Sequence, residues 1–163
     1  MNNLEIPVGT SDFAEIRQNG YYYVDKTVLI SELLKTASNK VTLITRPRRF
    51  GKSLGMSMLE NFFDIRKDSR TLFAGLEISQ NKALCDEWMN QYPTISVSFS
   101  RVFGLNYTKA YDMLTMVIAD LFNKHLYLIQ DGKGTDFENS TFKHLADGCA
   151  SEKEIKKIGR AHV

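Results

Sequence analysis

The chain has 163 residues, of which 43% are hydrophobic and 25% charged, and its formal net charge is +2. These values suit one soluble globular domain with a real core, and the small net charge gives no global reason to expect a nucleic-acid or membrane partner. The first residues show no basic region followed by an apolar core, so neither a signal peptide nor a membrane span is expected. Cys85 and Cys149 lie far apart, which favours reduced, structural thiols in a cytoplasmic protein.

The first forty residues are predicted to contain two helices. A short helix is expected from Phe13 to Arg17 after the possible cap Ser11-Asp12, and a second from Val28 to Lys35 after the possible caps Asp25 and Thr27. The aromatic run 21–24 is β-prone but short, and we assign it to the core.

A short apolar run at 41–45 predicts a strand, and Arg46-Pro47-Arg48-Arg49-Phe50-Gly51-Lys52-Ser53 follows it directly. Apolar residues then recur at helical spacing, which predicts a helix from Gly51 to about Ile65. Strand, turn, Gly-Lys-Ser and helix form the context of a phosphate-binding loop. Arg46 stands where the usual pattern has its first glycine.

The part of this motif that fits has a specific physical basis. Backbone N–H groups at a helix start have no partner inside the helix, and the helix dipole adds partial positive charge, so a phosphate can bind there. Gly51 lets the backbone approach oxygen atoms closely. Lys52 supplies a mobile cation for the outer phosphates, and the Ser53 hydroxyl can ligate Mg²⁺.

The part that departs from the motif is stiff and basic. Pro47 pushes Arg46 towards extended geometry, and Arg46 resists the positive φ that a glycine tolerates. The guanidinium groups of Arg46, Arg48 and Arg49 can pair with phosphates or with carboxylates of a partner. Three other interpretations stay open: a solvated basic turn, a module that binds nucleic-acid backbone, and a nucleotide kinase, for which the sequence shows no lid or acceptor pocket.

Beyond the loop, the pattern predicts a charged break at 66–70, a compact turn at 72–78 and a helix over 81–90 with Trp88 in the core. Alternation over 94–100 predicts a second strand, whose serines at the candidate positions exclude a Walker B carboxylate. A long amphipathic helix is expected from Tyr107 to Leu126. The weaker pattern after it predicts a loop at 130–134, a short helical turn at 142–146 and a helix opening at 151–155.

The loop sequence resembles the Walker A motif of the bacterial AAA-ATPase-like proteins, in which the missing first glycine is the norm. Other segments resemble that family in the same order along roughly residues 4–125: Ile6-Pro7-Val8-Gly9 with Asp12-Phe13, Tyr23-Val24-Asp25-Lys26-Thr27, Ser57-Met58-Leu59 with Phe62-Phe63, Leu72-Phe73-Ala74-Gly75-Leu76, and Tyr92-Pro93. The resemblance implies an α/β fold, namely a partial P-loop NTPase (AAA-like) domain with a mainly parallel sheet flanked by helices and truncated before Walker B.

The resemblance also implies a function and a site. The cofactors would be ATP and Mg²⁺, with hydrolysis expected only in the full-length protein, where a nuclease-like region often follows and could contact nucleic acid. The binding residues would be Arg46, Pro47, Arg48, Arg49, Phe50, Gly51, Lys52, Ser53 and Leu54 in the loop, with Asp25 and Lys26 near the mouth of the site. Lys52 would be catalytic and Ser53 would bind the metal. Under this view the aromatic run 21–24 has the alternative role of a lid over the base.

The final residues are expected to lie outside the natural domain. Residues 158–163 are the peptide that ATC GGA AGA GCA CAC GTC would encode, a sequence that matches a common sequencing adapter. We therefore expect the domain to comprise residues 1–157, followed by a non-native tail. The three histidines His125, His144 and His162 show no metal-binding spacing with one another or with the cysteines.

Overall fold

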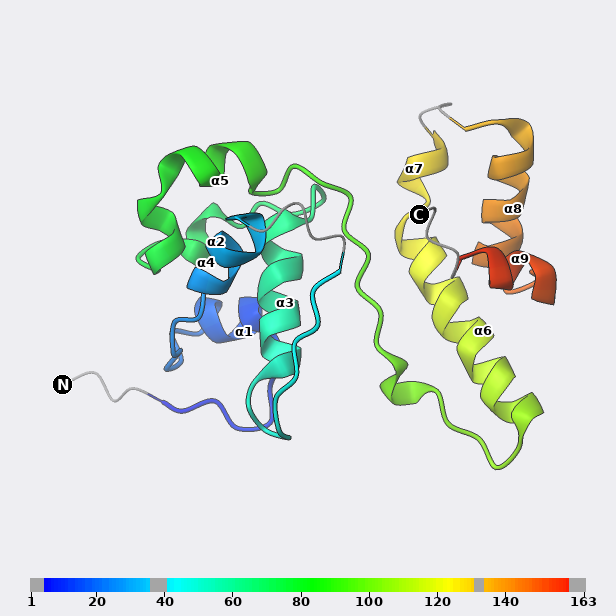
Figure 1. Ribbon diagram of the computed structural model, residues 1–163, viewed down its shortest axis with the longest axis horizontal. Helices are drawn as coiled ribbons and strands as arrows, with labels where there is room; N and C mark the ends of the chain where they lie inside the picture. The colour runs from blue at the N-terminus through cyan, green and yellow to red at the C-terminus, as the bar shows by residue number, and fades with distance from the viewer. Residues whose placement is uncertain (1–4, 36–40, 131–133, 159–163) are drawn as a thin grey trace. The chain divides into compact units, whose positions relative to one another are not determined.

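The chain folds into two compact units, Met1–Thr94 and Ile95–Val163. A computed structural model describes residues 5–35, 41–130 and 134–158. Helices provide the regular structure of the described residues in each unit (Figure 1). All residues of the predicted phosphate-binding loop lie in the first unit.

Six helical segments build the described part of the first unit. They are α1 (Phe13–Gln18), α2 (Val28–Lys35), α3 (Lys52–Phe63), α4 (Arg70–Phe73), the 3-10 helix η1 (Glu77–Gln80) and α5 (Lys82–Trp88). The predicted helices α1, α2, α3 and α5 are confirmed, with boundaries shifted by one or two residues. The segment predicted as a charged break and a compact turn contains the short helices α4 and η1.

Capping side chains explain where two of these helices begin. The Asp12 carboxylate accepts the N–H groups of Ala14 and Glu15 at the start of α1, and the Asn81 side chain accepts the N–H of Leu84 at the start of α5. Each cap satisfies donors that a helix start leaves without partners. The N–H of Phe13 also donates to Ser57 Oγ at 3.0 Å, which joins α1 to α3.

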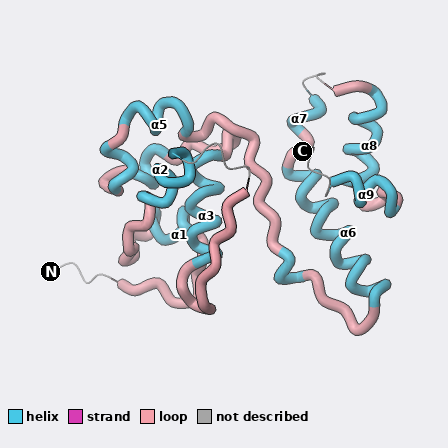
Figure 2. Tube along the Cα trace, viewed as in Figure 1, coloured by secondary structure: helices cyan, strands magenta, loops and turns pink. Residues whose placement is uncertain are grey.

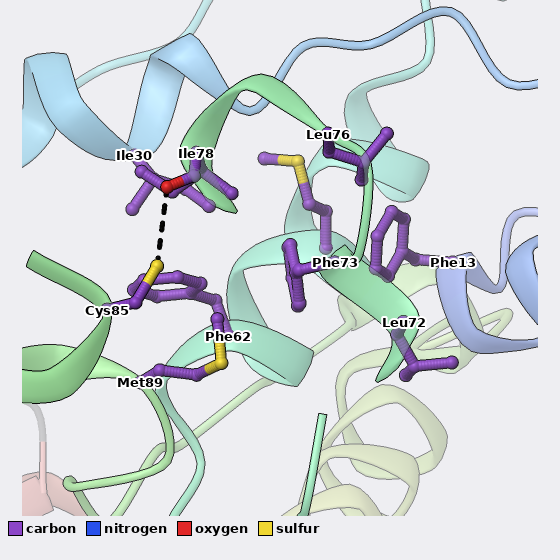
Figure 3. Packing of buried hydrophobic residues seen from close by; sticks show 10 residues of the cluster. Phe13, Ile30, Phe62, Leu72, Phe73, Leu76, Ile78, Cys85 and Met89 are labelled. Atoms are coloured by element: carbon purple, nitrogen blue, oxygen red, sulfur yellow. Dashed lines mark hydrogen bonds between the residues drawn. The ribbon is translucent and has the colours of Figure 1, made fainter. Parts of the chain in front are cut away.

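Aromatic rings from three helices form the centre of the first core (Figure 3). Phe13, Phe62 and Phe73 are fully buried. The ring centroids lie 4.8 Å apart for Phe13 and Phe73 and 5.3 Å apart for Phe62 and Phe73. Tyr23 packs edge-on against Phe13 at 5.3 Å, as expected for the aromatic run, whereas Tyr22 is half exposed. The core is therefore built between helices rather than on a sheet.

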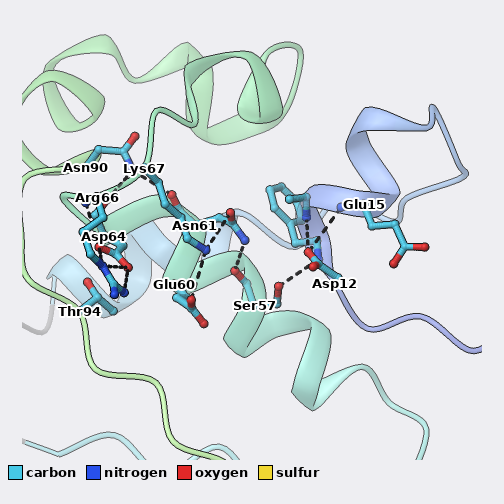
Figure 4. Close-up of polar contacts among 12 residues, drawn as sticks. Asp12, Glu15, Ser57, Glu60, Asn61, Asp64, Arg66, Lys67, Asn90 and Thr94 are labelled. Carbon is cyan, nitrogen blue, oxygen red and sulfur yellow. Dashed lines mark hydrogen bonds and ion pairs between the residues drawn. The ribbon is translucent and has the colours of Figure 1, made fainter. Parts of the chain in front are cut away.

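A polar cluster closes the C-terminal end of α3 (Figure 4). Asp64 is buried and forms an ion pair with Arg66. The Asn90 side chain donates to the carbonyls of Asn61 and Asp64 at 3.1 and 2.9 Å and accepts the N–H of Ser69 at 3.0 Å. Asn90 therefore holds the end of α3 against the segment that leads into α4.

The cluster also sets the charge of Asp64. Burial alone raises the pKa of this carboxyl, but hydrogen bonds from the side chain and N–H of Arg66 outweigh burial and lower the pKa below the ordinary 3.8. A lowered folded-state pKa adds stability above the unfolded value, and that stability is lost as the pH falls through 3.8 towards the folded value.

We expect this linkage to appear in acid. The free energy of unfolding of the first unit should fall as the pH drops from 5 to below 3.8. In Asp64→Asn this fall should be smaller, because the substituted side chain does not titrate. Urea titrations followed by the fluorescence of Trp88, the single tryptophan, would measure it. The exposed Asp68→Asn is the control, and equal pH slopes for both variants and the wild type would contradict the assignment.

The second unit is a helical hairpin with additions. It contains η2 (Phe99–Arg101), α6 (Tyr107–Lys124), α7 (Tyr127–Gln130), α8 (Asp136–Ala146) and α9 (Glu152–Ile158). The α6 and α8 helices pack together through Phe122 and Phe142, whose ring centroids lie 4.7 Å apart, and through a hydrogen bond of 2.7 Å from Asn123 Nδ2 to the Ala146 carbonyl. The long helix and the helix at 152 confirm the prediction, while α8 is much longer than the predicted turn.

The predicted parallel sheet is wrong. Among the described residues the structure has no strand, and the one strand-like backbone pairing is an isolated parallel bridge between Asp64 and Tyr92 (Figure 2). Residues 41–47 and 95–98 lie outside helices without a ladder, and the side chains of Leu43 and Ile95 are 85% and 65% exposed. Alternating β-branched residues favour a half-buried pleated surface, but a strand forms only against a partner, and the described residues supply none.

The structure bears only partly on two further expectations, the non-native tail and the lack of a membrane span. Residues 159–163 of the suspected tail, including His162, lie outside the described residues, and Ile158 ends α9. Across the described part of the chain, no helix combines the length and apolar character needed to cross a bilayer.

Candidate functional site

The loop before α3 turns through two residues with positive φ. Arg49 has φ 67° and Gly51 has φ 76°, whereas Arg46 does not have a positive φ. The left-handed turn therefore lies nearer the helix than the first-glycine position, and Arg46 needs no glycine-like geometry. A left-handed conformation at a residue with a Cβ costs about 1–2 kcal/mol, so Arg49 is a point of local strain.

The start of α3 presents free backbone donors. Gly51 is the N-cap and offers no side chain, and the first helical hydrogen bond runs from the N–H of Gly55 to the Gly51 carbonyl at 2.8 Å. Within the described residues, the N–H groups of Lys52, Ser53 and Leu54 have no acceptor. These donors stand at the positive end of a helix of 12 residues with no acidic side chain in its first turn. This is the arrangement that accepts an anion.

Lys52 folds back over its own loop. Its ammonium group donates to the carbonyls of Arg46 and Pro47 at 2.5 and 2.9 Å. The side chain is exposed, so these bonds are made at the surface and can be exchanged for other acceptors. Lys52 thus spans the loop from the start of α3 to the first residues of the loop.

A second lysine reaches the same loop from the segment before α2. Lys26 Nζ lies 3.4 Å from the Phe50 carbonyl oxygen, and a Cβ placed on Gly51 would lie 3.4 Å from the same nitrogen. A side chain at Gly51 would therefore meet Lys26 at an ordinary contact distance, and its main cost would be the strained backbone at φ 76°. The structure brings Lys26 together with residues 46–53, as the resemblance implies.

Five cations surround this loop without carboxylate partners. Within the described residues, none of the ion pairs involves these side chains, which are Lys26, Arg46, Arg48, Arg49 and Lys52. All five are exposed, as is Ser53 on the first turn of α3. The loop therefore carries a local excess of positive charge that the net charge of the chain does not reveal.

Asp25 differs from the other predicted site residues because its carboxylate is already engaged. One oxygen accepts the N–H and hydroxyl of Thr27 at 2.8 and 2.7 Å, and the other accepts the N–H of Glu77 at 2.8 Å. Burial raises the pKa of this carboxyl, but these hydrogen bonds outweigh burial and lower the pKa, so Asp25 is charged at neutral pH. Sequence reasoning missed the link to Glu77, because no local signal connects residues 52 positions apart.

The described residues include no group of three or more histidine, cysteine, aspartate or glutamate side chains placed to hold a metal ion. His125 is buried and lies near the Leu121 carbonyl, and His144 pairs with Glu154. Their surroundings agree with structural roles.

Comparison with known proteins assigns the family. The model of a family described as "Predicted AAA-ATPase" matches residues 7–158. The chain belongs to this family. The match confirms the resemblance carried by the loop and by the segments around it, and it extends through the second unit to α9. Arg46 thus stands at the first-glycine position in a chain that belongs to the predicted AAA-ATPase family.

One curated relative matches part of this chain. An uncharacterized protein from the vnfD 5' region of Azotobacter chroococcum mcd 1 is 34% identical over 100 residues, which make up 61% of this chain and 18% of the relative. The chain thus spans less than a fifth of that relative's length. No solved structure matches this predicted AAA-ATPase.

Proposed function

We propose that residues 46–54 bind the phosphates of ATP. The observation that carries this proposal is the uncapped start of α3, where the N–H groups of Lys52, Ser53 and Leu54 lack acceptors beneath a left-handed turn at Gly51. A triphosphate would supply those acceptors together with counter-charges for the unpaired cations around the loop. Membership of the predicted AAA-ATPase family supports ATP as the ligand.

Each side chain of the loop has a distinct proposed part. Lys52 would exchange the carbonyls of Arg46 and Pro47 for the outer phosphate oxygens, which carry full negative charge. Arg46, Arg48 and Arg49 would add guanidinium donors around the phosphate chain. Lys52 is the proposed catalytic residue because it would touch the group that is transferred.

The residues of the loop could supply one protein ligand to Mg²⁺. Mg²⁺ bound with nucleotides takes few protein ligands and completes its shell with phosphate oxygens and water. The exposed Ser53 hydroxyl, next to Lys52 on the first turn of α3, is the proposed protein ligand. When bound, the ion would neutralise charge on the phosphates, while the loop amides orient them.

The test compares two lysine variants of the chain. Labelled ATP with Mg²⁺ should bind the wild type, and Lys52→Ala should weaken binding at least about tenfold, since a hydrogen bond to a charged group contributes about 1.5–3 kcal/mol. The control is Lys82→Ala, which removes an exposed lysine from the start of α5. Equal affinity of the Lys52 variant and the wild type would remove the assignment.

The unpaired cations also favour a second candidate, a module that holds nucleic-acid backbone through Arg46, Arg48, Arg49 and Lys52. That function predicts binding that weakens steeply with salt and does not depend on Mg²⁺. Nucleotide binding predicts dependence on Mg²⁺ and competition between ATP and ADP. Measuring both ligands at two salt concentrations separates the candidates.

We propose ATP hydrolysis, and any nucleic-acid partner, only for the full-length protein. The curated relative is several times longer than the matched region, and within the described residues none of the loop cations forms an ion pair with a carboxylate. Binding by residues 46–54 is the part of the activity that this chain itself can show.

A further inference from the structure

The segment before α2 is fixed to η1 by a set of hydrogen bonds that leaves Lys26 over the loop. We propose that Asp25 is a positioning residue: its carboxylate holds Lys26 in place to bind the nucleotide phosphates and does not itself touch the nucleotide. This inference rests on the proposed binding of ATP. It gives Asp25 a different role from the direct contact that the family resemblance implies.

Both oxygens of Asp25 are committed to the protein. One accepts two donors from Thr27, which makes a tight turn through Lys26, and the other accepts the N–H of Glu77 at the start of η1. The Thr27 hydroxyl, which is completely buried, accepts the next N–H of η1 from Ile78 at 3.2 Å. The two side chains that flank Lys26 therefore satisfy two successive N–H groups of η1.

Lys26 lies between these two anchors. Because Asp25 and Thr27 are both tied to η1, the backbone at Lys26 has little freedom, and the side chain extends to the Phe50 carbonyl, 3.4 Å from Nζ. The ammonium group stands beside Gly51, where the loop comes closest to the free amides of α3. A cation whose backbone is fixed there stands within reach of an anion bound at those amides.

The charge of Asp25 argues against direct contact with the nucleotide. The carboxylate is ionised at neutral pH and has three donors around it, so it has little capacity left for another ligand. Its negative charge would also repel a triphosphate placed within contact distance.

A double-mutant cycle tests the inference in the full chain. Lys26→Ala should weaken Mg²⁺-ATP binding about tenfold, and Asp25→Asn should weaken it several-fold, within the coupling range of residues in one network. In the Lys26→Ala background, Asp25→Asn should add almost nothing, because the group that it positions is gone. Equal effects of Asp25→Asn in both backgrounds would overturn the inference and show either a direct contact or a general structural role.

A second measurement needs no nucleotide and separates this inference from the proposed function. Reductive methylation with labelled formaldehyde gives each lysine an NMR signal, and Lys26 should report a changed environment in Asp25→Asn while Lys82 does not. Thr27→Val, which removes the hydroxyl at similar volume, should act in the same way if Asp25→Asn folds poorly. An unchanged Lys26 signal in both variants overturns the inference. If the Lys26 signal shifts in the variants but the wild-type chain binds no ATP, the result supports the anchor and overturns both the proposed function and the role of Lys26 in it.

Discussion

Phe62→Ala should lower the free energy of unfolding of the first unit by about 3–5 kcal/mol, which is a large part of the stability of an ordinary domain. Phe62 is fully buried on α3, and its ring makes edge contacts with Phe63 at 5.0 Å and Phe73 at 5.3 Å between centroids. Removal of the ring leaves a cavity that the surrounding helices fill only in part.

Equilibrium unfolding in urea, followed by Trp88 fluorescence, measures this change in stability in the first unit of the chain. Trp88 packs against the same core and stacks on Tyr92 at 5.1 Å between centroids, so its signal reports the first unit. Phe103→Ala is the control, because that ring lies in the second unit and is 71% exposed. A loss below about 1 kcal/mol for Phe62→Ala would show that this side chain is not central to the core.

Asn90→Ala should destabilise the first unit by about 2–4 kcal/mol, from the loss of hydrogen bonds and from backbone strain together. The substitution leaves the carbonyls of Asn61 and Asp64 and the N–H of the buried Ser69 without their side-chain partner. Asn90 also has φ 57°, a conformation that asparagine tolerates better than alanine.

Asn90→Gly separates the two contributions. Glycine adopts positive φ without strain but forms none of the side-chain hydrogen bonds, so it should recover about 1 kcal/mol relative to alanine and remain less stable than the wild type. The same urea titration with Trp88 fluorescence compares the three chains. If glycine restores the full stability, the hydrogen bonds of Asn90 contribute nothing and the cluster in Figure 4 has a different role.

Helix periodicity and local capping made much of the helical structure predictable. The predicted ranges of α1, α2, α3, α5 and α6 agree closely with the structure because apolar spacing and caps act within a few residues. The start of helix α8 could have been predicted from the same kind of local signal. Thr135 and Glu138 form a capping box in the structure, and their Thr-x-x-Glu spacing is visible in the sequence. The short helices α4 and η1 had no comparable signal.

The sequence by itself determined the family, the Gly-Lys-Ser start of α3 and the helices whose pattern repeats along one chain segment. These features depend on residue identity and on spacing within a few helical turns, and both can be read directly from the amino-acid sequence. Only the tertiary structure decided that residues 41–47 and 95–98 make no sheet, that Asp25 is bonded to Glu77, and that Lys26 lies over the loop. A strand, an anchored carboxylate and a positioned lysine each require a partner distant in sequence, and local preference does not specify whether that partner is present.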